Sequence, residues 1–283
     1  MSELISGTLF IVATPIGNLE DITFRAVKVL KEASLIAAED TRHSKKLLQH
    51  YGINTKVISL HNYNESKRSE LLLQHLLQGE SLALISDAGT PLISDPGYLL
   101  VQKARESNIK VVPIPGPSAL ITALCASGLP TDKFIFEGFL PVKIEALRQK
   151  LLELKSEKRT LIIYEAPHRI SKLINAMIEI LGEDRSVVIA RELTKMFETI
   201  RGGSLKDIKI WLESGSNQQK GEFVVLVRGI LEDKKAITSN VERILSILLP
   251  VLTTKKTVEI TAKITGANKN EVYKLALAMQ KCK

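Results

Sequence analysis

The fold is decided by the stretch Ser81-Leu-Ala-Leu-Ile-Ser-Asp-Ala-Gly-Thr-Pro-Leu-Ile-Ser-Asp-Pro-Gly97, in which a buried strand runs into a long polar loop. The apolar residues 82–85 predict a strand over Ser81–Ser86 that is covered on both faces, as in a parallel sheet. The loop that follows contains two glycines, two prolines and two aspartates, so it cannot continue the strand. In open α/β sheets, ligands bind beside loops of this kind, at the carboxyl ends of the strands.

The same alternation of strand and helix extends through residues 1–115. Continuous apolar runs predict further strands at Thr8–Ala13, Leu35–Ala38, Val57–Leu60 and Val111–Ile114. Helical spacing of apolar residues predicts helices at Thr23–Ala33, Thr41–Tyr51, Glu65–Gln78 and Tyr98–Ser107. These elements predict a parallel sheet with helices on both faces.

A proline-rich segment ends this first domain. Residues 113–117 contain three prolines, which predict a stiff hinge and a domain boundary between residues 115 and 116. Residues 116–230 form a second, mixed α/β domain in this prediction. Its helices are expected at Ser118–Ala126, Pro167–Leu181 and Leu205–Ser214, and its strands at Phe134–Glu137, Thr160–Glu165, Val187–Arg191, Thr199–Arg201 and Glu222–Val227.

The last segment, residues 231–283, is predicted to be a basic tail of three helices. Ser239 and Glu242 have the spacing of a capping box, and Asn268 with Glu271 repeats it. Between them, a helix over Thr257–Thr265 ends at Gly266, which can adopt the left-handed C-cap conformation. Two short helices joined at a glycine resemble a helix-turn-helix that contacts nucleic acid, although a plain helical hairpin fits the same pattern.

Charge is distributed unevenly over these segments. The net charge is +8: residues 1–115 carry 12 basic and 12 acidic side chains, residues 116–230 carry 17 and 14, and residues 231–283 carry 10 and 5. This distribution predicts a neutral front half that holds a small molecule and a basic rear half that faces a polyanion. A solvated basic tail without a partner explains the same counts.

Composition excludes several protein classes. An apolar fraction of 45% and a charged fraction of 25% are ordinary for a globular protein and unlike a disordered chain. No apolar run approaches the roughly 20 residues of a membrane span, and the first residues lack the pattern of a signal peptide. Cys125 and Cys282 match no metal-ligand spacing, and Cys125 is expected to be a small buried hydrophobe. We therefore expect a cytoplasmic protein without a metal or a membrane partner.

Three loops at predicted strand ends expose backbone groups to a ligand: 13–19, 86–97 and 115–119. A tight turn explains any one of them, but three in one domain favour a binding site. The loops contain neither lysine nor arginine, and they match neither the Walker A nor the dinucleotide fingerprint, so a phosphorylated ligand is disfavoured. S-adenosylmethionine fits such a site, because it is a phosphate-free cation with hydroxyl groups.

Several segments of the sequence resemble a known family. The stretch Phe10–Arg42, which begins Phe-Ile-Val-Ala-Thr-Pro-Ile-Gly-Asn-Leu and ends Ala-Ala-Glu-Asp-Thr-Arg, is similar to the ribosomal RNA small-subunit methyltransferase I family. The segments Ile85–Gly97, Pro113–Ser118, Tyr164–Arg169 and Arg191–Lys195 match in the same order. The resemblance covers about residues 7–230, and the tail is of the expected kind.

The resemblance implies the tetrapyrrole-methylase fold, that of the class III methyltransferases. Two α/β domains would hold S-adenosylmethionine in the cleft between them, with a small C-terminal helical extension. The implied activity is 2′-O-methylation of a cytidine ribose in the decoding region of 16S rRNA, and the implied partners are the small ribosomal subunit and a second copy of the chain. The residues implied to bind the cofactor are Pro15, Asp87, Gly89, Thr90, Ser118, Ala119, Ala166 and Gly221.

The transfer requires that the ribose hydroxyl be positioned and lose a proton. The matched motifs provide as catalytic candidates Glu165, His168, Arg191, Glu192 and Lys195. Each has a structural alternative: Arg191 and Glu192 could form an ion pair, and His168 could cap a helix. Glu39 and Arg42 also belong to the motifs, and Arg42 and Arg169 are expected to bind RNA phosphates. The sequence assigns no general base.

Two rival functions follow from the same features. A methylase of the same fold could act on a tetrapyrrole or on a modified amino acid of a protein, but the basic rear half favours RNA. A non-catalytic DNA-binding regulator built on the tail would leave the three strand-end loops unexplained.

Overall fold

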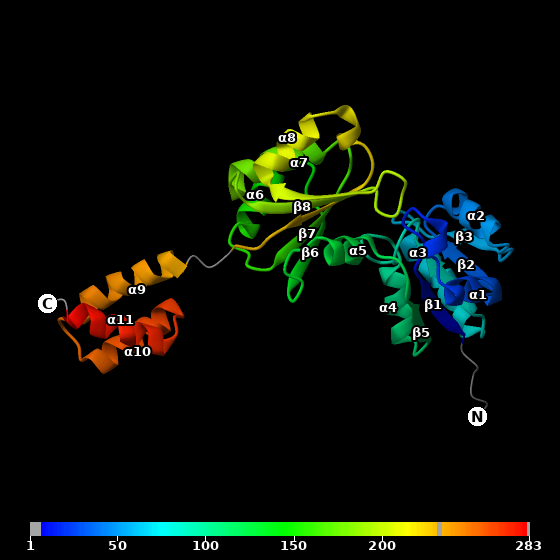
Figure 1. Ribbon diagram of the computed structural model, residues 1–283. Helices are drawn as coiled ribbons and strands as arrows, with labels where there is room; N and C mark the ends of the chain where they lie inside the picture. The colour runs from blue at the N-terminus through cyan, green and yellow to red at the C-terminus, as the bar shows by residue number, and fades with distance from the viewer. Residues whose placement is uncertain (1–6, 231–233, 282–283) are drawn as a thin grey trace, which may run out of the picture. The chain divides into compact units, whose positions relative to one another are not determined.

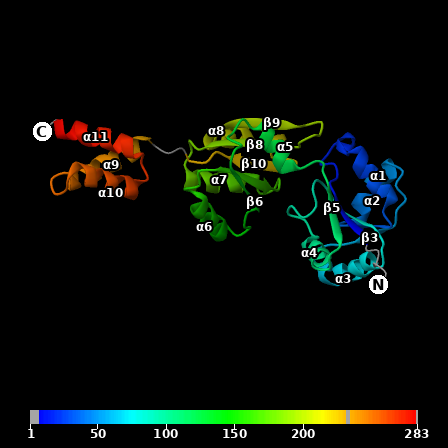
Figure 2. The ribbon, with the colours of Figure 1, turned by 90° about the horizontal axis from the view of Figure 1, so that it is seen from below.

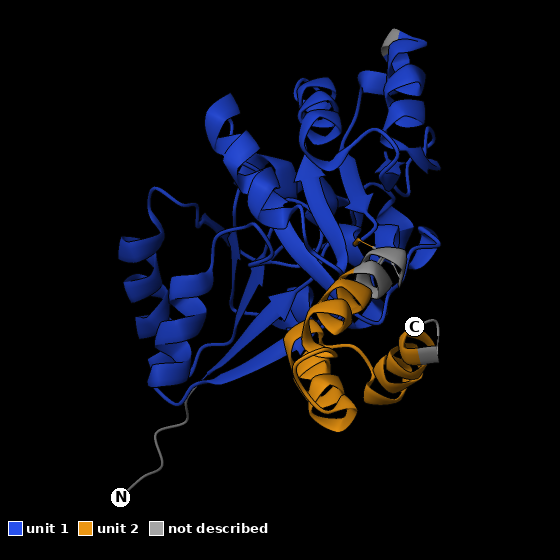
Figure 3. Cartoon of the chain, turned by 90° about the vertical axis from the view of Figure 1, so that its left-hand side faces the viewer, with its two compact units in different colours: residues 1–229 blue, residues 230–283 orange. Residues whose placement is uncertain are grey.

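A computed structural model describes residues 7–230 and 234–281 of the chain. The chain forms two compact units, residues 1–229 and residues 230–283 (Figure 3). The first unit contains two five-stranded sheets and eight α-helices in its described residues. The fold class predicted from the sequence is confirmed, whereas the boundary between residues 115 and 116 stays a prediction.

The first sheet is entirely parallel, with the strand order β3-β2-β4-β1-β5. Its strands are β1 (Thr8–Val12), β2 (Leu35–Ala38), β3 (Val57–Ser59), β4 (Leu82–Ile85) and β5 (Lys110–Ile114). The helices are α1 (Phe24–Glu32), α2 (Thr41–His50), α3 (Glu65–Leu77) and α4 (Tyr98–Glu106). Helices α1 and α2 lie on one face of the sheet and α3 and α4 on the other, as predicted (Figures 1 and 2). Their apolar side chains form one buried cluster on each face.

Loops at the carboxyl edge of this sheet are tied to one another. Thr14 and Gly89 exchange two backbone hydrogen bonds of 2.9 and 3.0 Å, and the Thr14 hydroxyl donates to the carbonyl oxygen of Ser86. Gly89 has a φ of +79°, a backbone conformation that side chains disfavour. The Thr90 hydroxyl donates to the carbonyl oxygen of Pro117 at 3.0 Å. The three predicted loops therefore form one connected rim.

The second sheet is mixed, with the strand order β6-β7-β10-β8-β9. Its strands are β6 (Phe134–Phe139), β7 (Thr160–Glu165), β8 (Ser186–Arg191), β9 (Thr199–Ser204) and β10 (Phe223–Val227). Helix α5 (Ala119–Ala126) packs on one face, and α6 (Ile144–Leu154), α7 (Ile170–Leu181) and α8 (Leu205–Glu213) cover the other. Ile16 of the first half joins the α5 core, so the two sheets share apolar packing.

Two local sequence predictions in this unit are wrong, and one helix, α6, was not predicted. Helix α7 begins at Ile170 rather than at Pro167, because residues 167–169 form a turn ahead of it. Cys125 is exposed rather than buried, since it lies on the outer side of α5. Cys282 falls outside the described residues.

The second unit contains the three predicted helices, α9 (Lys234–Leu248), α10 (Thr254–Thr265) and α11 (Lys269–Lys281). Gly266 has the predicted left-handed conformation, and the Asn268 side chain accepts the N–H of Asn270 at the start of α11. The predicted capping box at Ser239 is wrong, because α9 begins five residues earlier, at Lys234. No described helix is long and apolar enough to cross a bilayer.

Candidate active site

A cavity of about 390 Å³ lies between the two halves of the first unit. Residues before 116 contribute the loop after β4, and residues after 115 contribute the segment that leads into α5, the ends of β7 and β8 and the start of β10. None of the lining residues is a lysine or an arginine. They are Ile16, Ala88, Gly89, Thr90, Ile93, Ser94, Asp95, Ser118, Ala119, Phe139, Tyr164, Glu165, Ala166, Pro167, Ala190, Leu193, Glu222, Phe223 and Val224.

Asp95, which lines the cavity, belongs to a group of neighbouring carboxylates that also contains Glu39 and Asp87. Burial raises the pKa of Glu39, and the neighbouring charges of Asp95 and Asp87 raise it further. Burial also raises the pKa of Asp95, with a smaller contribution from Asp87. Oδ1 of Asp87 accepts the backbone N–H of Asp40 at 3.0 Å, which ties the start of α2 to this loop. Mutually repelling carboxylates of this kind favour a cationic ligand.

Glu165, at the end of β7, presents a buried carboxylate on the second-half side. Its Oε1 accepts the backbone N–H of Ala166 at 2.8 Å and lies 3.1 Å from Nε of Arg169. Its Oε2 is buried and has no hydrogen-bond partner among the described residues. Burial raises the pKa of this carboxyl. Glu165 thus combines one anchored oxygen with one buried oxygen that no described residue satisfies.

Tyr164 forms an aromatic wall next to Glu165. Its ring packs edge-on against Phe136 and Phe139, with centroids 4.8 and 5.8 Å away. Its hydroxyl accepts the N–H of Leu120 at 3.0 Å, and burial raises its pKa to about 12. The hydroxyl therefore keeps its proton at neutral pH and anchors the first turn of α5.

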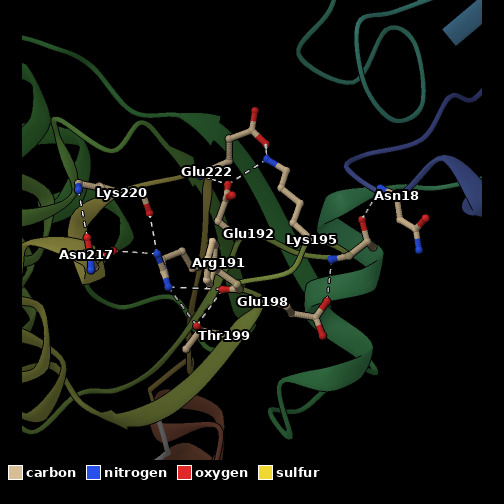
Figure 4. A network of polar contacts seen from close by, with 11 residues as sticks. Asn18, Arg191, Glu192, Lys195, Glu198, Thr199, Asn217, Lys220 and Glu222 are labelled. Carbon is tan, nitrogen blue, oxygen red and sulfur yellow. Dashed lines mark hydrogen bonds and ion pairs between the residues drawn. The ribbon is translucent and has the colours of Figure 1, made fainter. Parts of the chain in front are cut away.

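A cluster of opposite charges lies where the β8–β9 loop meets the other half (Figure 4). Nζ of Lys195 lies 2.9 Å from Oε1 of Glu192 and 2.8 Å from Oε2 of Glu222. The same Oε1 of Glu192 accepts the N–H of Glu222 at 3.0 Å. Gly221, with a φ of +90°, leaves room for Glu192, since an added Cβ would lie 2.4 Å from Cγ of Glu192. The cluster fixes the start of β10, which lines the cavity.

Arg191 has a structural role in this region. Its guanidinium donates to the carbonyl oxygens of Asn217, Lys220 and Phe197 and to the hydroxyl of Thr199. Figure 4 shows this arginine enclosed by those segments, away from Lys195. The predicted pairing of Arg191 with Glu192 is not what holds it.

The structure brings five of the eight predicted cofactor residues to the cavity: Gly89, Thr90, Ser118, Ala119 and Ala166. Pro15, Asp87 and Gly221 lie outside the lining, and their part in binding stays a prediction. Sequence reasoning missed Asp95, Tyr164 and Glu222. Asp95 lies in the very loop that was singled out, so its position after a strand could have indicated it.

The remaining predicted residues lie at the periphery. His168 is exposed in the turn before α7, and the N-cap of that helix is Arg169, so His168 does not cap it. The guanidinium of Arg169 is occupied by Glu165 and by the carbonyl oxygen of Leu140 at 2.7 Å, which disfavours the predicted phosphate contact. The Arg42 side chain is 90% exposed and pairs with Asp40 at the start of α2, where a phosphate can reach it.

Comparisons with known proteins agree with this architecture. Residues 8–209 match the family model of tetrapyrrole (corrin/porphyrin) methylases, and residues 235–280 match that of the RsmI C-terminal HTH domain. Within the described residues, no three His, Cys, Asp or Glu side chains are arranged to hold a metal ion.

Individual relatives narrow the family. The chain is 52% identical to the ribosomal RNA small subunit methyltransferase I of Pseudomonas aeruginosa, over 97% of this chain and 98% of that one. It is 49% identical to the protein of that name from Escherichia coli O157:H7, over 97% and 96%. The uroporphyrin-III-C-methyltransferase of Thermus thermophilus has the same fold, with a TM-score of 0.55 and 18% identity over 78% of this chain and 94% of that one. The chain therefore belongs to the tetrapyrrole methylases and, within them, to the ribosomal RNA small subunit methyltransferase I family.

Proposed function

We propose that this protein transfers a methyl group from S-adenosylmethionine to the 2′-hydroxyl of a cytidine ribose in 16S rRNA. The observation that carries this proposal is the cavity between the two halves. It is bordered by carboxylates and apolar walls and has no basic lining residue, which suits a phosphate-free organic cation. The membership of the chain in its family supports the RNA substrate.

The cofactor site is formed by strand-end loops. Gly89 and Thr90 would hold the donor from the first half, and Ser118, Ala119 and Ala166 would meet it from the second. Asp87 supports the site indirectly by holding the backbone of Asp40. The bound donor supplies a methyl group on a positively charged sulfur, and the carboxylates of Glu39 and Asp95 would stabilise that charge.

Glu165 is the candidate to accept the hydroxyl proton. It is the only one of the five predicted catalytic residues that lines the cavity, and its Oε2 has no partner among the described residues. A carboxylate whose pKa is raised by burial is a stronger base than an exposed one. Arg169 holds the other oxygen, so the free oxygen has a fixed direction. Lys195 would orient the cavity wall through Glu222 rather than act on the proton.

The partners follow from the same proposal. The basic tail and its match to an HTH family domain support contact with rRNA or with the small subunit. The exposed Met196 and Phe197, at 92% and 69%, support association of two copies through the β8–β9 loop. We place the reaction in the cytoplasm, where ribosomal subunits are found.

The decisive test is methyl transfer from tritiated donor to small ribosomal subunits that lack the modification, followed by nucleoside analysis. We expect label in 2′-O-methylcytidine. Label on a tetrapyrrole or a protein, with none on RNA, would instead assign one of the other substrates considered above.

A further inference from the structure

Exposed basic and aromatic side chains surround the carboxyl edge of the first sheet, outside the cavity. Tyr63 is fully exposed, and Tyr98 is 65% exposed. The side chains of Lys45, Lys46 and Lys67 are also exposed. We call this surface the outer rim, and it consists of Arg42, Lys45, Lys46, Tyr63, Lys67 and Tyr98.

The outer rim is continuous with the cavity. Strands β3, β2 and β4 are neighbours in a parallel sheet, so the segments that follow them lie along the same edge. Oε1 of Glu65 accepts the backbone N–H groups of Gly97 and Leu99, at 2.9 and 3.0 Å. This carboxylate joins the segment that carries Tyr63 to the start of α4, where Tyr98 lies. Both tyrosines are therefore fixed to the loop that lines the cavity.

The charges of the first half are segregated by position. Asp95 lines the cavity and Glu39 is its half-buried neighbour, whereas the side chains of Arg42, Lys45, Lys46 and Lys67 are exposed. Lys45, Lys46 and Lys67 form no ion pair with any residue of the described ranges, 7–230 and 234–281. The 12 basic and 12 acidic residues of residues 1–115 therefore cancel in number but not in position: acidic side chains lie beside the cavity, and basic side chains lie on the outer rim. A polyanion would be repelled by the first and attracted by the second.

The tyrosines add a second kind of recognition. The ring of Tyr63 lies edge-on to that of His61, with centroids 6.1 Å apart. Large exposed aromatic side chains next to lysines are typical of surfaces on which unpaired bases stack while phosphates are neutralised. A folded protein partner would favour a continuous apolar patch, and lysines interrupt this one.

We infer that the outer rim binds the RNA strand next to the target nucleotide, with phosphates on its basic side chains and unpaired bases on Tyr63 and Tyr98. This inference rests on the proposed function, since it concerns the substrate of the same cavity. It assigns RNA contact to the half of the chain whose charges cancel, in addition to the basic tail.

The test compares two matched double variants of the full chain. Lys45→Glu/Lys46→Glu alters the outer rim, and Lys56→Glu/Lys110→Glu makes the same charge change at exposed positions on the opposite edge of the sheet. The dissociation constant for unmethylated small subunits is measured directly, without methyl transfer. We expect a rise of about tenfold or more for the rim variant, with a shallower salt dependence, and little change for the control. Cofactor affinity, measured by calorimetry, should stay the same in both.

Stacking is tested by Tyr63→Ala and Tyr98→Ala against Tyr63→Phe and Tyr98→Phe. We expect the alanine variants to weaken subunit binding about tenfold and the phenylalanine variants to bind as the unaltered protein does. Equal losses in the rim and control pairs, or no loss in either, would overturn the inference. A loss of self-association, measured by sedimentation, together with unchanged affinity for the subunits would also overturn the inference, because the outer rim would then be an interface between two protein chains. Failure of the proposed function is seen separately, as subunit binding without methyl transfer by the unaltered protein.

Discussion

The backbone N–H of Asn18 donates to Oγ1 of Thr194 at 3.1 Å, although the two residues are 176 positions apart. Asn18 follows β1 of the first sheet, and Thr194 lies in the loop between β8 and β9 of the second. Next to this bond, the side chain of Lys195 packs against Gly17, where an added Cβ would lie 2.5 Å from Cγ of the lysine. The β8–β9 loop therefore holds the two halves together at one side of the cavity.

Replacement of Lys195 by methionine should loosen this junction. Glu192 and Glu222 would lose their shared cation and repel each other, so we expect a loss of about 1–2 kcal/mol in the free energy of unfolding. Denaturant titration measures the change. The control is Lys206→Met, which breaks the exposed pair with Glu183 and should cost less than about 0.5 kcal/mol. Equal effects in the two variants would show that Lys195 is not part of the junction.

Glu165→Gln should reduce kcat by about a hundredfold or more, because the amide cannot accept the hydroxyl proton. Cofactor affinity, measured by calorimetry, should be little changed. In the unaltered enzyme kcat should fall as the pH is lowered through the pKa of Glu165, since the protonated acid is no longer a base. Burial raises that pKa, so the fall should begin at a higher pH than for an ordinary glutamate. If Glu165→Gln kept most of its kcat and the same fall of kcat at low pH, Glu165 would not be the group that accepts the proton.

Cofactor affinity should depend on pH through Glu39 and Asp95. A cation binds the ionised acids, so affinity should decrease as the pH falls through their pKa values, which lie above the ordinary 4.5 and 3.8. Glu39→Gln should weaken binding at pH 8 and flatten the dependence, as followed by calorimetry over a pH series. Glu20→Gln, an exposed site on the 3₁₀ turn η1 (Leu19–Asp21), should leave both unchanged.

Gly221→Ala should destabilise the protein by about 2–3 kcal/mol, because it combines a φ of +90° with a clash against the Glu192 side chain. Gly52→Ala is the matched control. Gly52 also has a positive φ, of +61°, but an added Cβ meets nothing within 4 Å. Thermal unfolding should show a smaller loss of stability for the control. Similar losses in the two variants would mean that the Glu192 side chain can move away from the added methyl group without destabilising the protein.

Removal of residues 231–283 should weaken binding to small subunits and reduce its dependence on salt, because ten basic side chains are lost against five acidic ones. Cofactor affinity should be retained, since the cavity lies wholly within residues 16–224. Filter binding at several salt concentrations and calorimetry measure the two quantities. Unchanged RNA affinity would show that the tail has a structural role.

Local patterns predicted much of the fold. The apolar runs of the first sheet located all five strands, because β2 and β4 are fully buried and the other three strands are also mostly apolar. Helix α6 was not predicted, although Leu147, Leu151 and Leu154 are buried at helical spacing. The spacing of these leucines was therefore sufficient to predict the helix. The capping-box prediction at Ser239 was wrong because polar residues in the interior of a helix can have the same sequence spacing as a capping box.

The site was harder to predict because its contacts join distant residues. Glu222 pairs with Lys195, 27 positions earlier, and Asp87 accepts the backbone N–H of Asp40, 47 positions earlier. The net charge of residues 1–115 sums to zero and does not reveal that Glu39 is half-buried beside Asp95 whereas Lys45 is exposed.

The carboxylates beside the cavity also bear on turnover. Transfer of the methyl group would leave a neutral sulfur on the donor, so the proposed attraction of Glu39 and Asp95 for that atom would be lost. The same side chains that would favour the fresh donor would then bind S-adenosylhomocysteine less tightly, which would promote its exchange for a new donor.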